Sequence, residues 1–480
     1  MSVKRHTAYN LAGALIPTLL ALGTIPLYLH AMGAERFGAL SAIWIICGSV
    51  GFFDLGLNRA LSYSVAKASA DDPDHRAPLV ATALVVGSLS AAGAALLTYF
   101  GSDWYFTSSF GAAQSVIDEV GRALPLVAAT SITTVLVGVI TGALQGNRSF
   151  LQANLFQTGM AVSLQVGPIV YLLPGWESIV SMMTAVLFLR IIVLAFGLFA
   201  IARELGVRAL VGFRREEVRP LLSFSKWTMG IAFVGPIILY CDKILLGGLV
   251  GGPALAFYNI PFQLAQRIAL IPGAVGSAIF PDLVNLDTQG RSEMTSRATS
   301  YSYMFITLPS FLVILFSNTL LELWLSITPS RELTITCGLL ILSFWVNCAS
   351  QVYHTSLVTM NRPATVFYIM VAEVIAYVPL QYVAISLFGV VGAAASFLLL
   401  CFADTVLMFR FSKLKNREVK FIGAEFLILA AGLLVSAYAS SSVVALTSAA
   451  VLGGSAAVAL RWRLLATTVP SFDFWRCRDA

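Results

Sequence analysis

Charged residues are scarce in this chain. Only 11% of its 480 residues are Asp, Glu, Lys or Arg, whereas about a quarter of the residues in a soluble domain are charged. Hydrophobic residues make up 58% of the sequence, and the mean hydropathy is +0.84. With so few charges the chain cannot cover a water-facing surface. Most of its surface must therefore face lipid.

Motifs for metal binding and for soluble-enzyme chemistry are missing as well. The six cysteines are dispersed, without a CxxC pair or a Cys/His cluster, so the usual zinc and iron–sulfur patterns are excluded. No Walker, HExxH or GxSxG motif occurs, and no polar segment exceeds about 20 residues. We therefore expect no metal, no cofactor and no enzymatic activity. The alternative hypothesis is an integral-membrane enzyme that acts on lipid-linked sugars. Such an enzyme would need a sizeable loop outside the membrane.

Long apolar runs are abundant. A helix needs about 20 apolar residues to cross a bilayer, and runs of this kind recur along almost the whole chain. The sequence thus predicts an all-α polytopic membrane protein with about fourteen spans. The expected spans are 8–32, 37–65, 78–100, 121–143, 152–173, 178–202, 222–249, 254–281, 298–325, 333–358, 364–387, 389–411, 422–440 and 443–462.

The spans fall into two similar groups. Asn147-Arg148 lies near the end of the fourth span and Asn361-Arg362 near the end of the tenth, an offset of 361 − 147 = 214. A repeated six-helix unit is a transporter plan in which the substrate binds between the halves. The predicted division is an N-terminal lobe, a basic cytoplasmic linker, a C-terminal lobe, and a basic loop with two additional helices and a cytoplasmic tail, at 1–202, 203–220, 221–411 and 412–480 respectively.

The basic residues predict the orientation of the chain. The formal net charge is +6, but Lys and Arg punctuate hydrophobic helices and form no continuous patch, which argues against a nucleic-acid partner. Most of them lie in loops on one side, and only Arg36, Arg122 and Arg331 lie on the other. Because basic loops stay in the cytoplasm, we expect both termini to be cytoplasmic.

The first two spans carry a family pattern. They combine an Asn-led first helix containing proline, a Gly-x-Glu-x-Phe-Gly turn at 33–38, and an Asp-Leu-Gly-Leu step at 54–57. This stretch resembles the opening of bacterial polysaccharide flippases, the Wzx-like branch of the MOP transporter superfamily. Residues 240–281 are similar to the second-half opening of the same family. The resemblance implies a two-lobed transporter in the bacterial cytoplasmic (inner) membrane that alternates between inward-open and outward-open states.

The resemblance also implies a substrate, an oligosaccharide linked to undecaprenyl diphosphate. Membrane lipids and, as a further candidate, the polysaccharide polymerase machinery are the other expected partners. The same superfamily contains multidrug exporters coupled to cations. Those carry an acidic residue in the first helix, and 8–32 contains none. This difference argues against drug export, which we keep as the alternative function from the same superfamily.

Charges inside apolar spans are the candidate site residues. A charged side chain costs at least about 2.5 kcal/mol at the centre of a membrane helix, so it normally faces protein or a wet cavity. Arginine and lysine can hold a diphosphate. The candidates for binding substrate are Arg59, Arg190, Lys226, Lys243 and Arg267. For Arg190 and Arg267, an ion pair with a carboxylate is the structural alternative, and for Lys226 it is interfacial anchoring.

Four carboxylates are candidates for ion coupling or for structural pairing. A carboxylate at membrane depth can carry a proton or a cation through a transport cycle. These residues are Asp54, Asp242, Glu373 and Asp404. Asp242 and Lys243 are neighbours that point about 100° apart on a helix, so we expect no necessary pairing between them. The sequence does not choose between coupling and structure.

Overall fold

A computed structural model describes residues 3–54, 56–71, 76–223, 226–360, 362–414, 419–438 and 453–454. Its chain forms two compact units, Met1–Asn259 and Ile260–Ala480. Each is described separately below. Within the described residues every regular element is an α-helix or a 3₁₀ helix, which confirms the all-α prediction. The boundary between the units falls inside α10, and the division at 202 and 221 stays a prediction.

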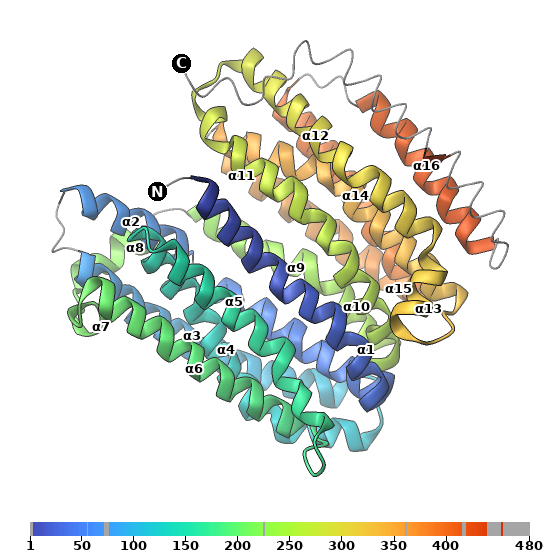
Figure 1. Ribbon diagram of the computed structural model, residues 1–480, viewed down its shortest axis with the longest axis horizontal. Helices are drawn as coiled ribbons and strands as arrows, with labels where there is room; N and C mark the ends of the chain where they lie inside the picture. The colour runs from blue at the N-terminus through green and yellow to red at the C-terminus, as the bar shows by residue number, and fades with distance from the viewer. Residues whose placement is uncertain are drawn as a thin grey trace. The chain divides into compact units, whose positions relative to one another are not determined.

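The first unit contains the N-terminal helices (Figure 1). Its elements are α1 (Val3–Ser49), η1 (Val50–Asp54), α2 (Leu57–Asp71), α3 (Arg76–Ser108), α4 (Gln114–Gly146), α5 (Phe150–Val166), η3 (Gly167–Leu172), α6 (Ile179–Leu205), α7 (Arg208–Val211), η4 (Arg215–Glu217), α8 (Val218–Ser223), α9 (Lys226–Leu249) and the start of α10 (Gly252–Gln266).

Residues 33–38 join the two arms of α1. Gly33 has φ 75° and ψ 168°, a backbone conformation that glycine adopts at little cost. Beyond it, Glu35 Oε1 accepts a hydrogen bond from Ala113 N at 2.5 Å, and Arg36 pairs with Glu119 at 3.2 Å. The other oxygen of Glu119 accepts from Ile179 N at 2.7 Å. The Gly-x-Glu-x-Phe-Gly motif thus fixes the starts of α4 and α6.

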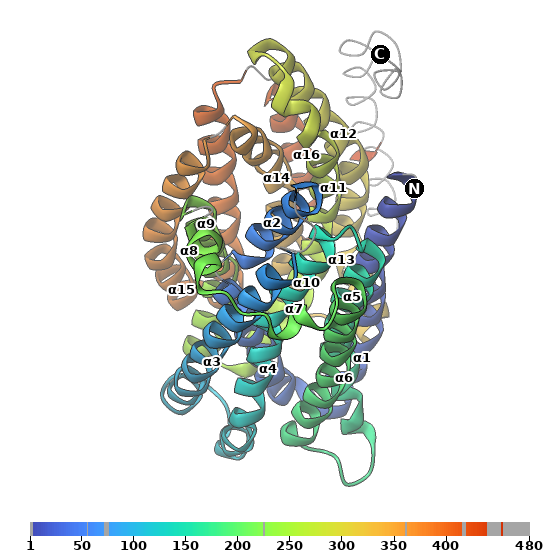
Figure 2. The same ribbon diagram turned by 90° about the vertical axis from the view of Figure 1, so that its left-hand side faces the viewer.

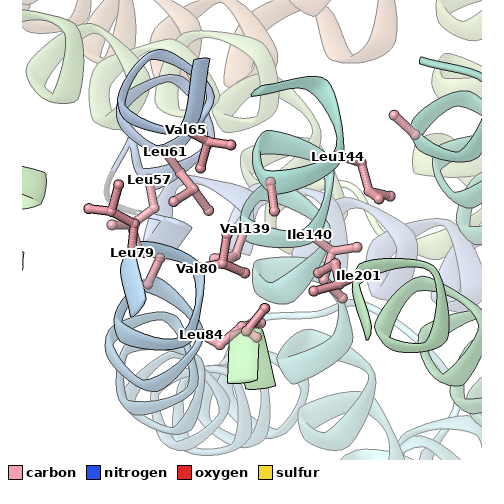
Figure 3. Packing of buried hydrophobic residues seen from close by; sticks show 14 of the residues in the cluster. Leu57, Leu61, Val65, Leu79, Val80, Leu84, Val139, Ile140, Leu144 and Ile201 are labelled. Carbon is pink, nitrogen blue, oxygen red and sulfur yellow. The ribbon is translucent and has the colours of Figure 1, made fainter. Parts of the chain in front are cut away.

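A leucine- and valine-rich core holds α2, α3, α4 and α6 together (Figure 3). The cluster includes the buried residues Leu57, Leu61, Leu79, Ile140 and Ile201. Figure 2 shows α3 and α4 side by side, as the contacts between these two helices require.

Three glycines on α4 let α2 and the segment before it approach closely. An added Cβ at Gly138 would lie 2.5 Å from Asp54 Oδ2, at Gly142 2.5 Å from the carbonyl oxygen of Asn58, and at Gly146 2.8 Å from that of Ser62. These glycines, spaced four residues apart, therefore serve close helix packing.

The second unit contains the rest of α10, followed by η5 (Arg267–Ala269), α11 (Leu270–Asn285), α12 (Thr288–Leu315), α13 (Ser317–Leu325), α14 (Arg331–Thr359), α15 (Pro363–Ser412) and α16 (Val419–Tyr438). The 50-residue α15 consists of two helices joined at Gly389, which has φ 56° and ψ −133°. α15 packs against α14, and α16 lies along α12 and α14 (Figure 1).

In the described part of the chain, nine helices are long and apolar enough to cross a membrane. The expected number is larger because α15 contains two expected spans, and because η5 divides the expected span 254–281. The expected span 37–65 is not one continuous helix, since it begins in the second arm of α1 and continues through η1 into α2. α16 contributes a shorter apolar helix, Ile422–Ala437. The expected span 443–462, the tail and Asn361 lie outside the described residues, apart from 453–454. A count of about fourteen fits this arrangement.

Candidate substrate and ion-coupling residues

Lys243 is buried in an ion pair. Its Nζ lies 3.0 Å from Asp242 Oδ1 and donates to the carbonyl oxygen of Leu239 at 2.6 Å. Tyr258 on α10 donates its hydroxyl to Asp242 Oδ2 at 2.6 Å, and Nζ lies 5.9 Å from the Tyr240 ring centroid. Their positions on the helix do not require this pair. It forms because the flexible lysine stem bends back along α9 to reach the carboxylate.

Arg190 is a buried guanidinium on α6, only 4% exposed. Its Nη1 donates to the carbonyl oxygen of Thr130 at 3.2 Å and to the hydroxyls of Thr133 and Thr134 at 3.0 and 2.6 Å. Its Nε is buried and has no hydrogen-bond partner among the described residues. Within the described part of its unit, no carboxylate pairs with Arg190. Neutral oxygens of α4 hold this charge in place.

Asp54 and Arg59 flank the start of α2. Asp54 Oδ1 accepts the backbone N–H of Gly56 at 2.7 Å, and the carboxylate also accepts from Asn58. A carboxylate that satisfies the first N–H groups of a helix is a cap. Arg59 is exposed on α2. The Asp-Leu-Gly-Leu step is therefore the start of a capped helix, with Gly56 at φ 71°.

Arg267 begins η5, the 3₁₀ break between α10 and α11. Its side chain is half-buried, and no carboxylate pairs with it in the described part of the second unit. Short 3₁₀ stretches within long helices often mark hinges. Lys226 is the first residue of α9, but its side chain lies outside the described residues.

Glu373 and Asp404 come from the two arms of α15. Glu373 is buried, and its Oε1 has no hydrogen-bond partner among the described residues. Asp404 Oδ2 accepts from Asn347 Nδ2 at 3.0 Å and from Ser350 Oγ at 2.5 Å, both on α14.

Sequence reasoning identified the charges and missed their neutral partners. Tyr258, the three threonines of α4, Asn347 and Ser350 are polar residues inside apolar runs, and the sequence contains many of these. The one available signal is helical spacing. Asn347 and Ser350 are three residues apart and therefore share a helix face.

Comparison with known proteins identifies the family. The sequence profile described as polysaccharide biosynthesis protein matches residues 3–287, more than half of the chain. A putative O-antigen transporter of Shigella flexneri is 23% identical over 412 residues, covering 85% of this chain and 97% of that protein. A probable low-salt glycan biosynthesis flippase of Haloferax volcanii is 24% identical over 224 residues, covering 45% of this chain and 46% of that protein.

Two solved structures have a similar fold. The lipid II flippase MurJ, in an inward closed conformation, superposes with a TM-score of 0.69 at 13% identity, covering 96% of this chain and 100% of that one. An inward-facing multidrug resistance MATE transporter of the MOP superfamily gives 0.66 at 13% identity, covering 85% and 95%. The chain has the fold of these transporters, and it belongs to the polysaccharide biosynthesis protein family.

Proposed function

We propose that this protein moves an oligosaccharide, linked to a polyprenyl diphosphate, from the inner to the outer leaflet of the bacterial cytoplasmic membrane by alternating access. Family membership and the alignment over 97% of an O-antigen transporter support this proposal. The observation that carries it is Arg190, a buried cation held by threonines and by no carboxylate in the described part of its unit. A diphosphate would supply the missing negative charge. We assign the protein no enzymatic step.

The guanidinium groups have the right chemistry for a diphosphate. Arginine presents its N–H donors in a planar fork that can hold two phosphate oxygens at once. Arg190 keeps a free Nε donor, and Arg267 lies at a break in its helix. We place these two at the core of the phosphate path, with Arg59 and Lys226 as loading residues. Lys243 would first have to leave Asp242 before it could bind phosphate.

Contacts within the first unit support the proposed orientation. Arg76 at the start of α3 donates to Asn147 Oδ1 beyond the end of α4, at 2.9 Å. The opposite end of α4 holds the Glu119 contact with Ile179 N. Arg76 therefore lies at the end of α4 opposite Glu119, and we assign the Arg76 end to the cytoplasm. A contact with the polysaccharide polymerase machinery is part of the proposal without structural support of its own.

The decisive experiment measures the lipid-linked saccharide pool of a deletion strain, with leaflet sidedness probed by an enzyme that cannot cross the membrane. Repeat units should be trapped on the cytoplasmic leaflet, and the full chain should release them. Arg190→Ala and Arg267→Ala should reduce release at least tenfold, because each removes a phosphate donor worth about 1.5–3 kcal/mol. Arg122→Ala, on an exposed side chain, should complement fully.

Protein levels in the membrane must match among these variants. Full complementation by both arginine variants would rule out the phosphate role of these residues. A normal pool with normal sidedness in the deletion strain would contradict the proposed function itself. Dye efflux would then test the superfamily alternative, drug export.

A further inference from the structure

The short segment 207–215, which follows α6 and contains α7, exposes apolar and basic side chains together. Its large exposed apolar residues are Val207, Val211 and Phe213, at 68%, 75% and 48% exposure. Its three arginines, Arg208, Arg214 and Arg215, are exposed as well. The segment contains no Asp or Glu, so its formal charge is +3. Neither the core nor the proposed phosphate path uses these side chains.

Other residues of the segment 207–215 attach it firmly to the first unit. Ala209 is buried in the core shared by α2, α3, α4 and α6, and Leu210 packs against that core. Arg214 N donates to Thr82 Oγ1 on α3 at 2.9 Å. α7 itself packs against both α3 and α6. The exposed side chains therefore project from a segment whose backbone is held in place.

The segment 207–215 lies where two spans reach the edge of the bilayer. α6 has 27 residues, about 40 Å at 1.5 Å per residue, and it ends at Leu205, two residues before Val207. Thr82, which accepts from Arg214 N, lies within the first two turns of α3. The hydrocarbon core measures about 30 Å and the bilayer with its headgroups about 40–45 Å. This position coincides with the phospholipid headgroups.

The three guanidinium groups of the segment have unused donors. None of them has a hydrogen-bond or ion-pair partner within the part of the chain that the structure describes. Arginines elsewhere in the same unit do have partners, since Arg76 donates to Asn147 and Arg36 pairs with Glu119. A guanidinium group can donate to two oxygens of one phosphate. The segment thus offers donors to phosphate groups outside the protein.

Acidic residues flank the segment without cancelling its charge. Residues 203–219 contain five Arg and three Glu, a net charge of 5 − 3 = +2. Glu204 accepts from Gln152 Nε2 on α5 at 2.7 Å, so this carboxylate already has a partner within the fold. The surface is therefore complementary to an anionic partner.

The apolar side chains identify that partner as lipid. Interfacial segments combine apolar residues, which enter the boundary between headgroups and acyl chains, with basic residues that are attracted to anionic lipids. Val207 and Val211 would otherwise expose their side chains to water at the level of the headgroups. A soluble partner would have to displace lipid to reach them.

We propose that the segment 207–215 is a binding site for the headgroups of anionic phospholipids in the leaflet that it faces. The arginines donate to the lipid phosphates, and the three exposed apolar side chains enter the adjoining acyl boundary. This site is separate from the transported saccharide and goes beyond the proposed function, because it requires neither the substrate nor a transport step.

The full chain in nanodiscs of phosphatidylcholine provides the test. Val211→Cys, with the six native cysteines replaced by alanine, supplies one thiol for a bimane fluorophore. Brominated phosphatidylglycerol or brominated phosphatidylcholine is then added, and bromine quenches the fluorophore on contact. Phosphatidylglycerol should reach half-maximal quenching at a mole fraction at least about threefold lower, because each nearby basic residue adds attraction to an anionic headgroup.

Charge variants locate the preference. A triple variant with Arg208→Gln, Arg214→Gln and Arg215→Gln should quench equally with both lipids. The matched control removes the same charge from exposed arginines elsewhere and should keep the preference; its substitutions are Arg122→Gln, Arg297→Gln and Arg331→Gln. Size-exclusion elution verifies folding. If the first triple variant fails to fold, salt replaces it, because the preference should fall in about 1 M NaCl, where the screening length is about 3 Å.

Three results would overturn the lipid site. The first is equal quenching by both lipids in the chain with all arginines, or a preference that survives both the triple substitution and high salt. The second is quenching by aqueous iodide with none from either brominated lipid, which would place the segment in water. The third is loss of the preference on adding inorganic diphosphate but not NaCl of equal ionic strength, which would assign the arginines to a diphosphate instead.

Discussion

Asp242 and Lys243 illustrate how adjacent charges can remain inside an apolar unit. The side chains are 0% and 2% exposed, and each polar atom of the pair has a partner on α9 or α10. Such a pair adds little net stability, because desolvation of both ions offsets their attraction. Removal of only one partner destabilises the fold strongly, since the other charge then stays buried without a counter-ion.

Lys243→Ala is therefore expected to lower the free energy of unfolding by about 3–5 kcal/mol. Thermal unfolding of the full chain in detergent, followed by fluorescence, measures the change. Tyr258→Phe removes one hydrogen bond to a charged group and should cost about 1.5–3 kcal/mol. The double variant Asp242→Leu with Lys243→Met removes both charges and should recover most of the loss. A double variant as unstable as Lys243→Ala would contradict the ion-pair explanation.

At the residue scale, the sequence predicts where charge is buried but not what surrounds it. Composition and hydropathy identify Arg190 because a charge inside an apolar run stands out. Thr133 and Thr134 do not stand out, because threonine is common in membrane helices and its partner depends on how α4 packs against α6. The placement of Glu373 and Asp404 on separate arms of α15 depends on the bend at Gly389, 16 residues beyond Glu373 (389 − 373).

Among the elements, the start of α10 lies very close to α1 and to the segment that follows α3. An added Cβ at Gly38 would lie 2.0 Å from the carbonyl oxygen of Gly252. Gly111 accepts from Gly252 N at 2.8 Å and donates to Gly247 O at 3.1 Å. These contacts are made by backbone atoms of glycines. A side chain at any of these positions would therefore push the segments apart.

Gly38→Ala should consequently destabilise the protein by about 1–3 kcal/mol, the usual range for overpacking. Gly23→Ala on the same helix is the matched control, because an added Cβ there meets nothing within 4 Å. Alanine is the better helix former by about 1 kcal/mol, so the control should be neutral or stabilising. Equal melting temperatures for the two variants would show that the Gly38 contact does not constrain the fold.

At the element scale, apolar length predicts the helices and misses their breaks. The expected span 254–281 is predominantly apolar, yet η5 interrupts it at Arg267–Ala269. Pro272 explains the break, because it has no N–H to donate to the carbonyl of Ile268 four residues earlier. The bend at Gly389 arises because this glycine has a positive φ of 56°, which is not a helical conformation. Hydropathy does not record either effect, although the residues responsible are visible in the sequence.

For the molecule as a whole, the first unit contains its own evidence for crossing the membrane. The contact between Glu119 and Ile179 N places the starts of α4 and α6 at the same end. α6 has 27 residues, about 40 Å at 1.5 Å per residue, which exceeds the roughly 30 Å of the hydrocarbon core. Arg122, near the start of α4, and Arg203, near the end of α6, must then lie at opposite faces.

Cysteine labelling can determine which face is cytoplasmic. In a variant whose six native cysteines are replaced by alanine, Arg122→Cys and Arg203→Cys each introduce one thiol at an exposed position. A maleimide that cannot cross the membrane should label position 122 in intact cells and position 203 only after permeabilisation, because basic loops stay inside. The reverse pattern would invert the proposed direction of transport. Labelling of both positions in intact cells would show that α6 does not cross the bilayer, and complementation of the deletion strain verifies that each variant is folded.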